Sequence, residues 1–387
     1  MISLKQLFLK KPYDVVFYYP QHFNRSKNGT NPYFDPLIAI CQKNNLRYLV
    51  LEEPDSKTKY PRNKQARKFD FWFYIILVLR KITPLVFFKN KGCGDEFIGK
   101  LISILTLNSF NATTYITISN SMINVLTGFN KNSYVYDLQH GIIYSWHWGY
   151  FNENGKLRLD LTNDRIGFLV YGKGFQDVFL KENKFLNAQN GRVKIIGNVL
   201  ENNSTTEQEF FSRNNIVYTL QITNHLNQED LLEEKKELVA FIELNKHLFI
   251  ENNVQLLLKH HPRFNNAIEL NDIISNYSFV KLTDKTITEL AESVFLNITL
   301  ASTSIFEFAL MGIPSYIIPN AFGQKVFKEE YKYPLNNLLL GDIITTHLFS
   351  KSNYKVYCDK VKEWALNFYK PFNENPFFEI INKRNEI

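Results

Sequence analysis

VQLLLKHHPR at residues 254–263 and VFLNITLASTS at residues 294–304 are the two segments that decide the fold. Each is an apolar run of strand length that stops at polar residues, a pattern typical of parallel strands buried on both faces. Ligands of open α/β sheets bind beyond the carboxyl ends of such strands. The sequence therefore predicts an α/β domain whose binding residues come directly after these two strands.

Three hydroxyl residues follow the second of these strands, namely Ser302, Thr303 and Ser304. Ser304 is a good N-cap, and Glu307 stands three positions later, where a capping box requires it. We expect a helix over residues 305–311 that ends at Gly312. A strand end, hydroxyls and a helix N-terminus together form an anion site. Ser304 as a simple helix cap is the alternative.

A histidine and a proline, His261 and Pro262, follow the first of these strands. Proline restricts the backbone here, which would hold the imidazole at the edge of the sheet. Lys259 and Arg263 flank the pair, so the local charge is positive and suits a phosphate. A structural histidine is the alternative, and the hydroxyl residues after the second strand favour the phosphate site.

KHHPR at residues 259–263, followed by STS at residues 302–304, resembles the His-Pro and Ser/Thr motifs of bacterial glycosyltransferases with the GT-B fold. It is most similar to capsule and lipopolysaccharide sialyltransferases, polysialyltransferases and Kdo transferases, which use CMP-activated sugars. The resemblance implies that His261 contacts the nucleotide phosphate and assists its departure, while the hydroxyls bind that phosphate. We also place Gln221 and Glu307 beside the nucleotide.

The resemblance covers roughly residues 216–319 and departs from the sialyltransferase pattern at one motif. Those enzymes carry two acidic residues and a glycine upstream of His-Pro, and this motif holds the base. Here the corresponding region is residues 221–230, in which Glu229 and Asp230 are not followed by glycine. The departure favours a base in the other half of the chain.

In that half, a strand expected over residues 133–138 leads into Gln139, His140 and Gly141. This segment resembles the Gln-His-Gly or Trp-His-Gly segment of capsule and teichoic-acid polymerising transferases, which implies that the histidine is a base. Histidine titrates near neutrality, so His140 is able to accept the proton of an acceptor hydroxyl. Gly141 would let a substrate approach closely. A hydrogen bond from His140 that only orients the loop is the alternative.

Two more residues are expected on the acceptor side of the site. His22 follows the first expected strand, and Trp146 belongs to the aromatic run YSWHWGY at residues 144–150. The alternatives are an incidental loop histidine and an aromatic run that fills a seam between domains. His147 lies near His140 without further convergent ligands, so we expect no metal.

The length of 387 residues exceeds one ordinary domain and suits two Rossmann-like halves. We therefore expect an α/β protein of the GT-B fold, with two such domains facing across a cleft. The polar segment ENNSTTE at residues 201–207 marks the boundary. The expected parts are an acceptor-side domain over 1–200, a nucleotide-sugar-binding domain over 201–350, and a C-terminal helix over 351–387 that returns toward the first domain.

Composition and cysteine usage exclude several classes of protein. Hydrophobic residues make up 45% of the chain and aromatic residues 15%, which excludes wholesale disorder. The three cysteines, Cys41, Cys93 and Cys358, are scattered, so neither a disulfide scaffold nor a cysteine zinc site is expected. The N-terminal residues do not have the pattern of a signal peptide. These observations favour a reducing cytoplasm.

The net charge of +7 indicates an anionic partner: nucleic acid, membrane or donor. The basic run KTKYPRNKQARK at residues 57–68 precedes the aromatic run FWFYIILVL at residues 71–79, which is too short to span a bilayer. A basic stretch before an aromatic helix suits an anionic membrane surface, here the inner face of the plasma membrane. A buried helix beside a solvated loop is the alternative. No nucleic-acid motif accompanies the charge.

The resemblance implies transfer of a sugar, of the sialic acid or Kdo type, from a CMP-activated donor. The acceptor would be a glycan or a lipid-linked glycan of surface polysaccharide or lipopolysaccharide. His140 would be the base and His261 the group at the leaving phosphate, with no cofactor and no metal. The alternatives are a nucleotide-sugar epimerase of the same fold, a polyol-phosphate polymerase of the teichoic-acid type, and a binding protein with a decayed site.

Overall fold

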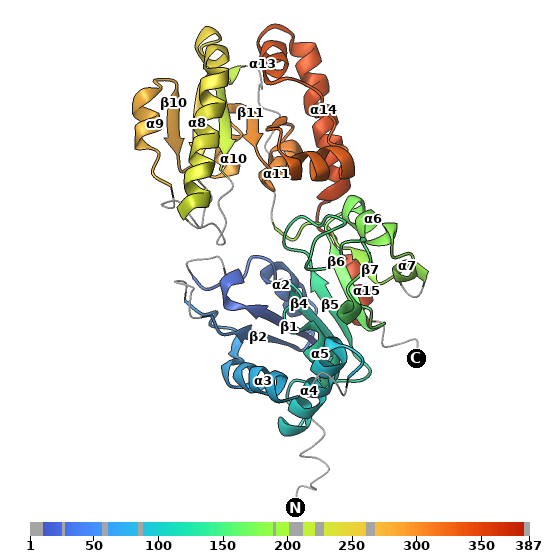
Figure 1. Cartoon of the computed structure of the whole chain (residues 1–387). Coiled ribbons are helices and arrows are strands. Elements are labelled where there is room, and N and C mark those ends of the chain that lie inside the picture. Colours follow the sequence, from blue (N-terminus) through green and yellow to red (C-terminus); the bar gives the residue numbers. More distant parts are fainter. Residues whose placement is uncertain are drawn as a thin grey trace, which may run out of the picture. The chain divides into compact units, whose positions relative to one another are not determined.

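The computed structural model describes residues 11–24, 28–55, 61–83, 88–188, 191–200, 212–220, 228–260 and 268–382. The chain folds into two compact units (Figure 1). The first unit comprises Met1–Glu201 and Lys370–Ile387, and the second comprises Asn202–Tyr369.

The first unit is built on a parallel sheet of seven strands in the order β3-β2-β1-β4-β5-β6-β7. Its central strands are almost wholly buried, as expected for a sheet covered on both faces. The strands are β1 (Tyr13–Pro20), β2 (Tyr48–Glu53), β3 (Arg67–Lys68), β4 (Ala112–Ile118), β5 (Tyr134–Leu138), β6 (Ile166–Val170) and β7 (Val193–Ile195).

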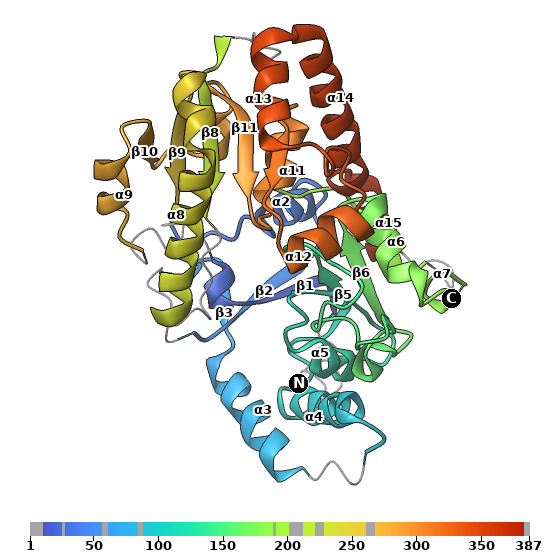
Figure 2. The ribbon, with the colours of Figure 1, turned by 45° about the horizontal axis from the view of Figure 1, so that its top comes forward.

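Helices connect these strands and cover the sheet (Figures 1 and 2). Helices α4 and α5 pack closely because each presents a glycine at the contact. A Cβ on Gly99 would lie 2.0 Å from the Val125 carbonyl oxygen. The helices are α2 (Asp35–Lys43), α3 (Asp70–Ile82), α4 (Lys91–Leu105), α5 (Ile123–Phe129), α6 (Lys173–Lys181), α7 (Phe185–Ala188) and α15 (Glu374–Asn382), with short 3₁₀ turns η1 (Gln21–Phe23) and η3 (Leu159–Leu161).

The second unit has a parallel sheet of five strands in the order β10-β9-β8-β11-β12. The strands are β8 (Asn215–Thr219), β9 (Gln255–Lys259), β10 (Val280–Thr283), β11 (Val294–Thr299) and β12 (Ser315–Ile317). Both segments on which the fold prediction rests, β9 and β11, are therefore confirmed as parallel strands.

Helices also connect the strands of the second unit, and α14 packs against α11 and α13 (Figure 2). The helices are α8 (Gln228–Glu251), α9 (Asn271–Asn276), α10 (Ile287–Leu290), α11 (Ser304–Leu310), α12 (Ala321–Gly323), the π-helical segment η5 (Gln324–Glu330), α13 (Leu340–Phe349) and α14 (Lys351–Phe368). The C-terminal region expected as one helix thus contains two, with α14 in the second unit and α15 in the first.

The helix after β11 is confirmed, but the way it begins differs from the expectation. The capping box predicted from Ser304 and Glu307 is wrong, because Thr303 is the N-cap and no side chain caps the helix. The Ser304 backbone N–H instead donates to the Ser302 hydroxyl at 3.2 Å. At the other end Gly312 adopts φ +72°, the left-handed conformation expected of a residue that ends a helix.

Among the described residues, no helix combines the length and the apolar composition that crossing a membrane requires.

Candidate functional site

In the second unit the strand order reverses between β8 and β11, and the carboxyl ends at such a reversal are where open α/β sheets bind their ligands. Ser304 is buried there, and its hydroxyl lies 3.0 Å from the hydroxyl of Thr219, the last residue of β8. This pair joins the two neighbouring strand ends. Ser302 and Thr303 are only half-buried, so these two residues present hydroxyl groups at the edge.

Lys259 brings a buried positive charge to the same edge, at the end of β9. Its Nζ donates a hydrogen bond to the Lys285 carbonyl oxygen at 2.6 Å. Burial lowers the pKa of Lys259, and the negative charge of Glu307 is the largest effect that opposes this shift. The pKa of His260 is lowered by burial and then by the neighbouring Lys259, which favours a neutral imidazole.

Four of the residues predicted for the donor side lie outside the described residues, namely Gln221, His261, Pro262 and Arg263. Their roles remain predictions. The described residues Lys259, Ser302 and Thr303 all stand at the carboxyl ends of β9 and β11, where the sequence placed them.

Glu307, in the first turn of α11, has a carboxyl group whose pKa is unusually high. Burial raises the pKa of Glu307 to about 7, and the charge of Lys259 partly offsets that rise. Near neutral pH the group is therefore divided between its neutral and ionised forms, which is the range required of a general acid or base.

The raised pKa of Glu307 has a measurable effect on stability. Between the ordinary value of 4.5 and about 7, the folded protein holds a proton that the unfolded chain has released. The free energy of unfolding should therefore fall as the pH rises through this window. Glu307→Gln should remove this fall and stabilise the second unit at pH 8 by roughly 1–3 kcal/mol.

Urea unfolding of both proteins at a series of pH values between 5 and 8 measures this effect. Glu289→Gln is the matched control, because that carboxyl is exposed and its pKa is lowered rather than raised, chiefly by hydrogen bonds from Thr286. Parallel pH profiles for the parent protein and Glu307→Gln would contradict the prediction.

In the first unit the strand order reverses between β1 and β4, so the equivalent edge lies at the ends of these two strands. The backbone after β4 is strained, because Ser119, Asn120 and Met122 have φ values of 60°, 54° and 51°. Asp137 on β5 accepts hydrogen bonds from Asn120 N and Tyr150 Oη, both at 2.6 Å. Burial raises the pKa of Asp137 to about 7. Asp137 thus fixes this turn to the aromatic run that follows β5.

The side chains of His140 and His22 both contact the ring of Phe23 at this edge. The Phe23 ring centroid lies 4.9 Å from that of His140 and 4.5 Å from that of His22. The Tyr33 hydroxyl donates to the His140 carbonyl oxygen at 3.3 Å, and His22 Nδ1 lies 3.6 Å from an oxygen of Asp55. The structure therefore brings together two histidines that the sequence assigned separately to the acceptor side.

Gln139 positions the loop that carries His140. Its amide nitrogen donates to the Gly141 carbonyl oxygen at 2.7 Å, and its amide oxygen accepts from Tyr171 N at 2.8 Å. The residue is 1% exposed. Through these bonds Gln139 supports the loop, and its predicted contact with the acceptor stays a prediction. A Cβ on Gly141 would meet no atom of the described residues within 4 Å, so this part of the chain leaves open space beside the loop.

The aromatic run after this loop packs largely on itself. The Trp146 ring lies 4.8 Å from Tyr144, and the His147 Nδ1 accepts a hydrogen bond from Gly149 N at 3.1 Å. Burial lowers the pKa of His147. Trp148 is 78% exposed, and is therefore the residue of this run most available for stacking on a sugar.

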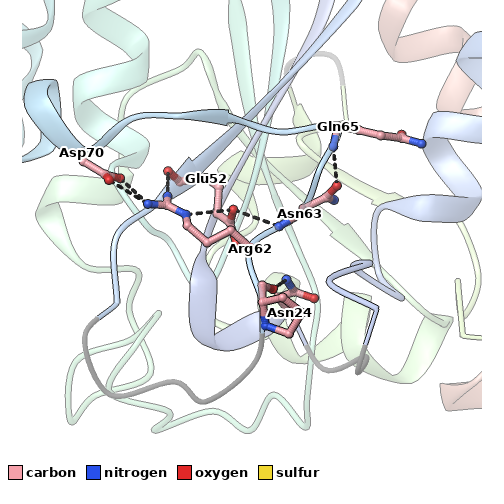
Figure 3. Close-up of polar contacts among 7 residues, drawn as sticks. Asn24, Glu52, Arg62, Asn63, Gln65 and Asp70 are labelled. Carbon is pink, nitrogen blue, oxygen red and sulfur yellow. Dashed lines mark hydrogen bonds and ion pairs between the residues drawn. The ribbon is translucent and has the colours of Figure 1, made fainter.

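Two carboxyl groups at the end of β2 were missed by the sequence analysis. Glu53 accepts hydrogen bonds from Tyr18 Oη at 3.0 Å and Ser121 Oγ at 2.6 Å, so it joins β1, β2 and the turn after β4. Glu52 is fully buried and accepts from Arg62 Nε and Asn63 N, both at 3.2 Å (Figure 3). Acidic residues that directly follow an apolar run, as in LVLEE, were the available signal.

Within the described part of the chain, no group of three or more histidine, cysteine, aspartate or glutamate side chains is arranged to hold a metal ion. Metal independence stays a prediction.

No protein-family model matches the sequence, and no curated protein matches it either. Solved structures do match. UDP-GlcNAc 2-epimerase from Neisseria meningitidis, bound to UDP-GlcNAc, superposes with a TM-score of 0.54 at 11% identity, over 92% of this chain and 96% of that one. TarM superposes with a TM-score of 0.54 at 10% identity, over 97% and 99%.

A variant of S. aureus TarM in complex with fondaparinux, alpha-GlcNAc-glycerol and UDP superposes with a TM-score of 0.52 at 11% identity, over 95% of this chain and 99% of that one. The chain has the GT-B fold. The two parallel sheets with Rossmann-like connections confirm the predicted fold class. At these identities the likeness establishes the fold alone.

Proposed function

We propose that this protein transfers a sugar from a nucleotide-activated donor to a hydroxyl of a glycan acceptor. The observation that carries the proposal is the distribution of chemistry over the two GT-B units. His140 stands at the carboxyl edge of the first sheet, and Lys259, Ser302 and Thr303 stand at the carboxyl edge of the second.

Each group fits one requirement of the transfer reaction. Transfer needs a base for the acceptor hydroxyl and a positive, hydrogen-bonding environment for the leaving phosphate. The His140 imidazole meets the first requirement, and open space adjoins the neighbouring Gly141. The ammonium of Lys259 and the hydroxyls of Ser302 and Thr303 meet the second, together with His261 and Arg263 from the sequence motif.

The donor is proposed as a pyrimidine nucleotide sugar. The His-Pro and Ser/Thr motifs favour a CMP-activated sugar of the sialic acid or Kdo type. One similar structure was solved with UDP-GlcNAc and another with UDP, so a UDP-activated sugar is the second candidate. The acceptor is proposed as a glycan or lipid-linked glycan, in keeping with the aromatic run beside His140.

The experiment is a donor panel with an internal control. Purified protein is incubated with CMP-sialic acid, CMP-Kdo, UDP-GlcNAc and a CDP-polyol, each with and without a glycan acceptor mixture, and nucleotide release is measured. We expect release from a CMP-sugar that depends on the acceptor and is lost in His140→Asn. Release of CMP from the CDP-polyol would instead establish the polymerase reaction.

One observation favours a second candidate, an epimerase of nucleotide sugars. Burial raises the pKa of Glu307 to about 7, so at neutral pH the carboxyl is present in both protonation states, as an acid–base group of an epimerase needs to be. An epimerase acts on its nucleotide sugar without an acceptor. Deuterium incorporation into UDP-GlcNAc in heavy water, followed by NMR, would reveal this activity and would be abolished by Glu307→Gln.

A further inference from the structure

Helix α3 of the first unit carries its apolar side chains on the outside. Phe71, Tyr74, Val78 and Ile82 are 66%, 57%, 54% and 65% exposed. Their spacing of three, four and four residues places them along one side of the helix, here called the apolar stripe. Ile76 alone among the 13 residues of α3 is buried, so the alternative of a buried helix is wrong.

Two ion pairs attach α3 to the rest of the unit, together with the buried Ile76 and its half-buried apolar neighbours. Nη1 of Arg62 lies 2.7 Å from both carboxylate oxygens of Asp70 at the start of the helix (Figure 3). Near its end, Arg80 forms two parallel hydrogen bonds of 2.8 Å with Asp95 on α4. Paired bonds of this kind fix orientation. The inner side of α3 is also apolar, so the helix departs from the usual surface pattern only in carrying apolar side chains on its exposed side as well.

Exposed apolar side chains continue onto the neighbouring helix. Phe97, Ile104 and Leu105 of α4 are 42%, 68% and 63% exposed, and Leu107 just beyond it is 61% exposed. Helices α3 and α4 lie side by side in both views (Figures 1 and 2). Clustered apolar exposure of this kind marks an interaction surface, whereas scattered single residues do not.

The segment that contains α3 carries more positive charge than its acidic residues neutralise. The acidic residues between 61 and 105 are Asp70, Asp95 and Glu96, and each is already in an ion pair with an arginine or a lysine. Six exposed cations of the same segment form no ion pair within the described part of the chain, namely Lys64, Arg67, Lys68, Lys81, Lys89 and Lys91. Three of them precede α3, Lys81 lies in its last turn, and Lys89 and Lys91 follow it, so positive charge stands at both of its ends.

We propose that α3 docks the protein onto an anionic lipid bilayer. The apolar stripe enters the interface between headgroups and acyl chains, and the six cations bind the lipid phosphates. At a rise of about 1.5 Å per residue the helix is about 20 Å long, shorter than the roughly 30 Å hydrocarbon core, so it lies in the plane of the surface. This inference rests on α3 and its surroundings and does not depend on the proposed function.

Charge decides between a membrane and a second copy of this chain. A symmetric dimer through the apolar stripe would bring the same six cations of both copies together, and like charges held close destabilise an interface. An anionic bilayer covers the apolar residues and neutralises the cations at the same time. The apolar stripe and the six cations together therefore fit an anionic bilayer better than a second copy of this chain.

The test is co-sedimentation of the full chain with vesicles of phosphatidylcholine alone or mixed with phosphatidylglycerol. We expect binding to the anionic vesicles only, weakening as salt is added. Removing one lysine should weaken binding about fivefold at low salt. The triple variant Phe71→Gln, Val78→Gln, Ile82→Gln should lose binding, and so should Lys64→Gln, Lys68→Gln, Lys81→Gln.

Matched controls come from the second unit, where exposed residues of the same types lie on helices. Leu244→Gln with Ile250→Gln, and Lys360→Gln with Lys362→Gln, should bind as the parent protein does. Thermal unfolding of each variant checks that it is folded. Equal binding by the parent and both triple variants, or no binding by the parent at low salt, would overturn the proposal.

A labelling experiment tests the position of α3 without disrupting it. Cys93 is exposed whereas Cys41 and Cys358 are buried, so Cys93→Ser leaves a background into which Val78→Cys is introduced. A polarity-sensitive dye on that cysteine should shift to shorter wavelength with anionic vesicles, and a dye on Leu244→Cys should not. Sedimentation equilibrium completes the test. Dimerisation that is lost in the Phe71, Val78 and Ile82 variant, without vesicle binding, would assign the surface to self-association and refute the membrane proposal.

Discussion

Replacing His140 with asparagine should lower the rate of sugar transfer by about 10²–10⁴-fold while nucleotide affinity is unchanged. The imidazole is expected to take the proton of the acceptor hydroxyl, a step that affects turnover and not donor binding. The measurement is single-turnover transfer rate beside nucleotide affinity from calorimetry. Asparagine keeps a polar side chain of similar size next to Phe23 and Tyr33, so the loop should hold its conformation.

Two comparisons make the His140 result decisive. Glu229→Gln and Asp230→Asn change exposed acids at the start of α8, the region that holds the base in the sialyltransferase pattern, and both should keep full activity. Loss of activity in these variants, with His140→Asn still active, would move the base to the second unit.

A third variant probes the space beside His140. Gly141→Ala should fold normally, because none of the residues that the structure describes lies within 4 Å of the added Cβ. The variant should raise the Michaelis constant for the acceptor alone.

Replacing His261 with alanine should reduce turnover by about 10²–10³-fold, the effect of removing one donor that stabilises developing negative charge. The histidine follows Lys259, whose buried ammonium supplies positive charge at the end of β9. The expected loss is greatest for donors whose leaving phosphate most needs protonation. Transfer from a natural nucleotide sugar and from a donor with a better leaving group, measured side by side, distinguishes this role from a general loss of structure.

The adjacent residue is the natural control for His261. His260 is half-buried, and burial and Lys259 lower its pKa, which suits a residue that packs as a neutral ring. His260→Ala should therefore affect stability more than turnover. If His260→Ala abolishes transfer and His261→Ala does not, the assignment within the motif is reversed.

Substitutions of the three hydroxyl residues after β11 should have two different effects, one on nucleotide binding and one on stability. Ser302→Ala and Thr303→Ala should each weaken nucleotide binding, because a hydrogen bond to a charged group contributes roughly 1.5–3 kcal/mol. Ser304→Ala should instead destabilise the fold, because its hydroxyl is buried against Thr219. Urea unfolding and calorimetric titration with the released nucleotide measure the two effects on the same samples.

The sequence determined the strands and their order of appearance along the chain. The apolar runs at β9 and β11 form strands because a buried parallel strand needs apolar side chains on both faces, a requirement that is visible without tertiary information. The same reasoning placed His140 and Lys259 at carboxyl edges, since polar residues follow directly where each run stops. Gly312 likewise ended α11 as expected, because its conformation is a local property of the backbone.

Only the tertiary structure decided what each polar group contacts. Ser304 turned inward to Thr219, a residue 85 positions away, so its hydroxyl does not cap the helix as the local pattern predicted. The Gln139 amide nitrogen donates to Gly141, and its amide oxygen accepts from Tyr171. The second bond forms only because β6 lies beside β5.

Helix α3 shows most clearly the difference between what the sequence determines and what the tertiary structure decides. Its apolar composition was evident from the sequence, but whether those side chains face a core or the solvent depends on what packs against them. The ion pairs Arg62–Asp70 and Arg80–Asp95 and the buried Ile76 hold the helix to the unit, whereas Phe71, Val78 and Ile82 stay exposed. Burial is a property of the packed molecule, because it depends on neighbours brought together from distant parts of the chain.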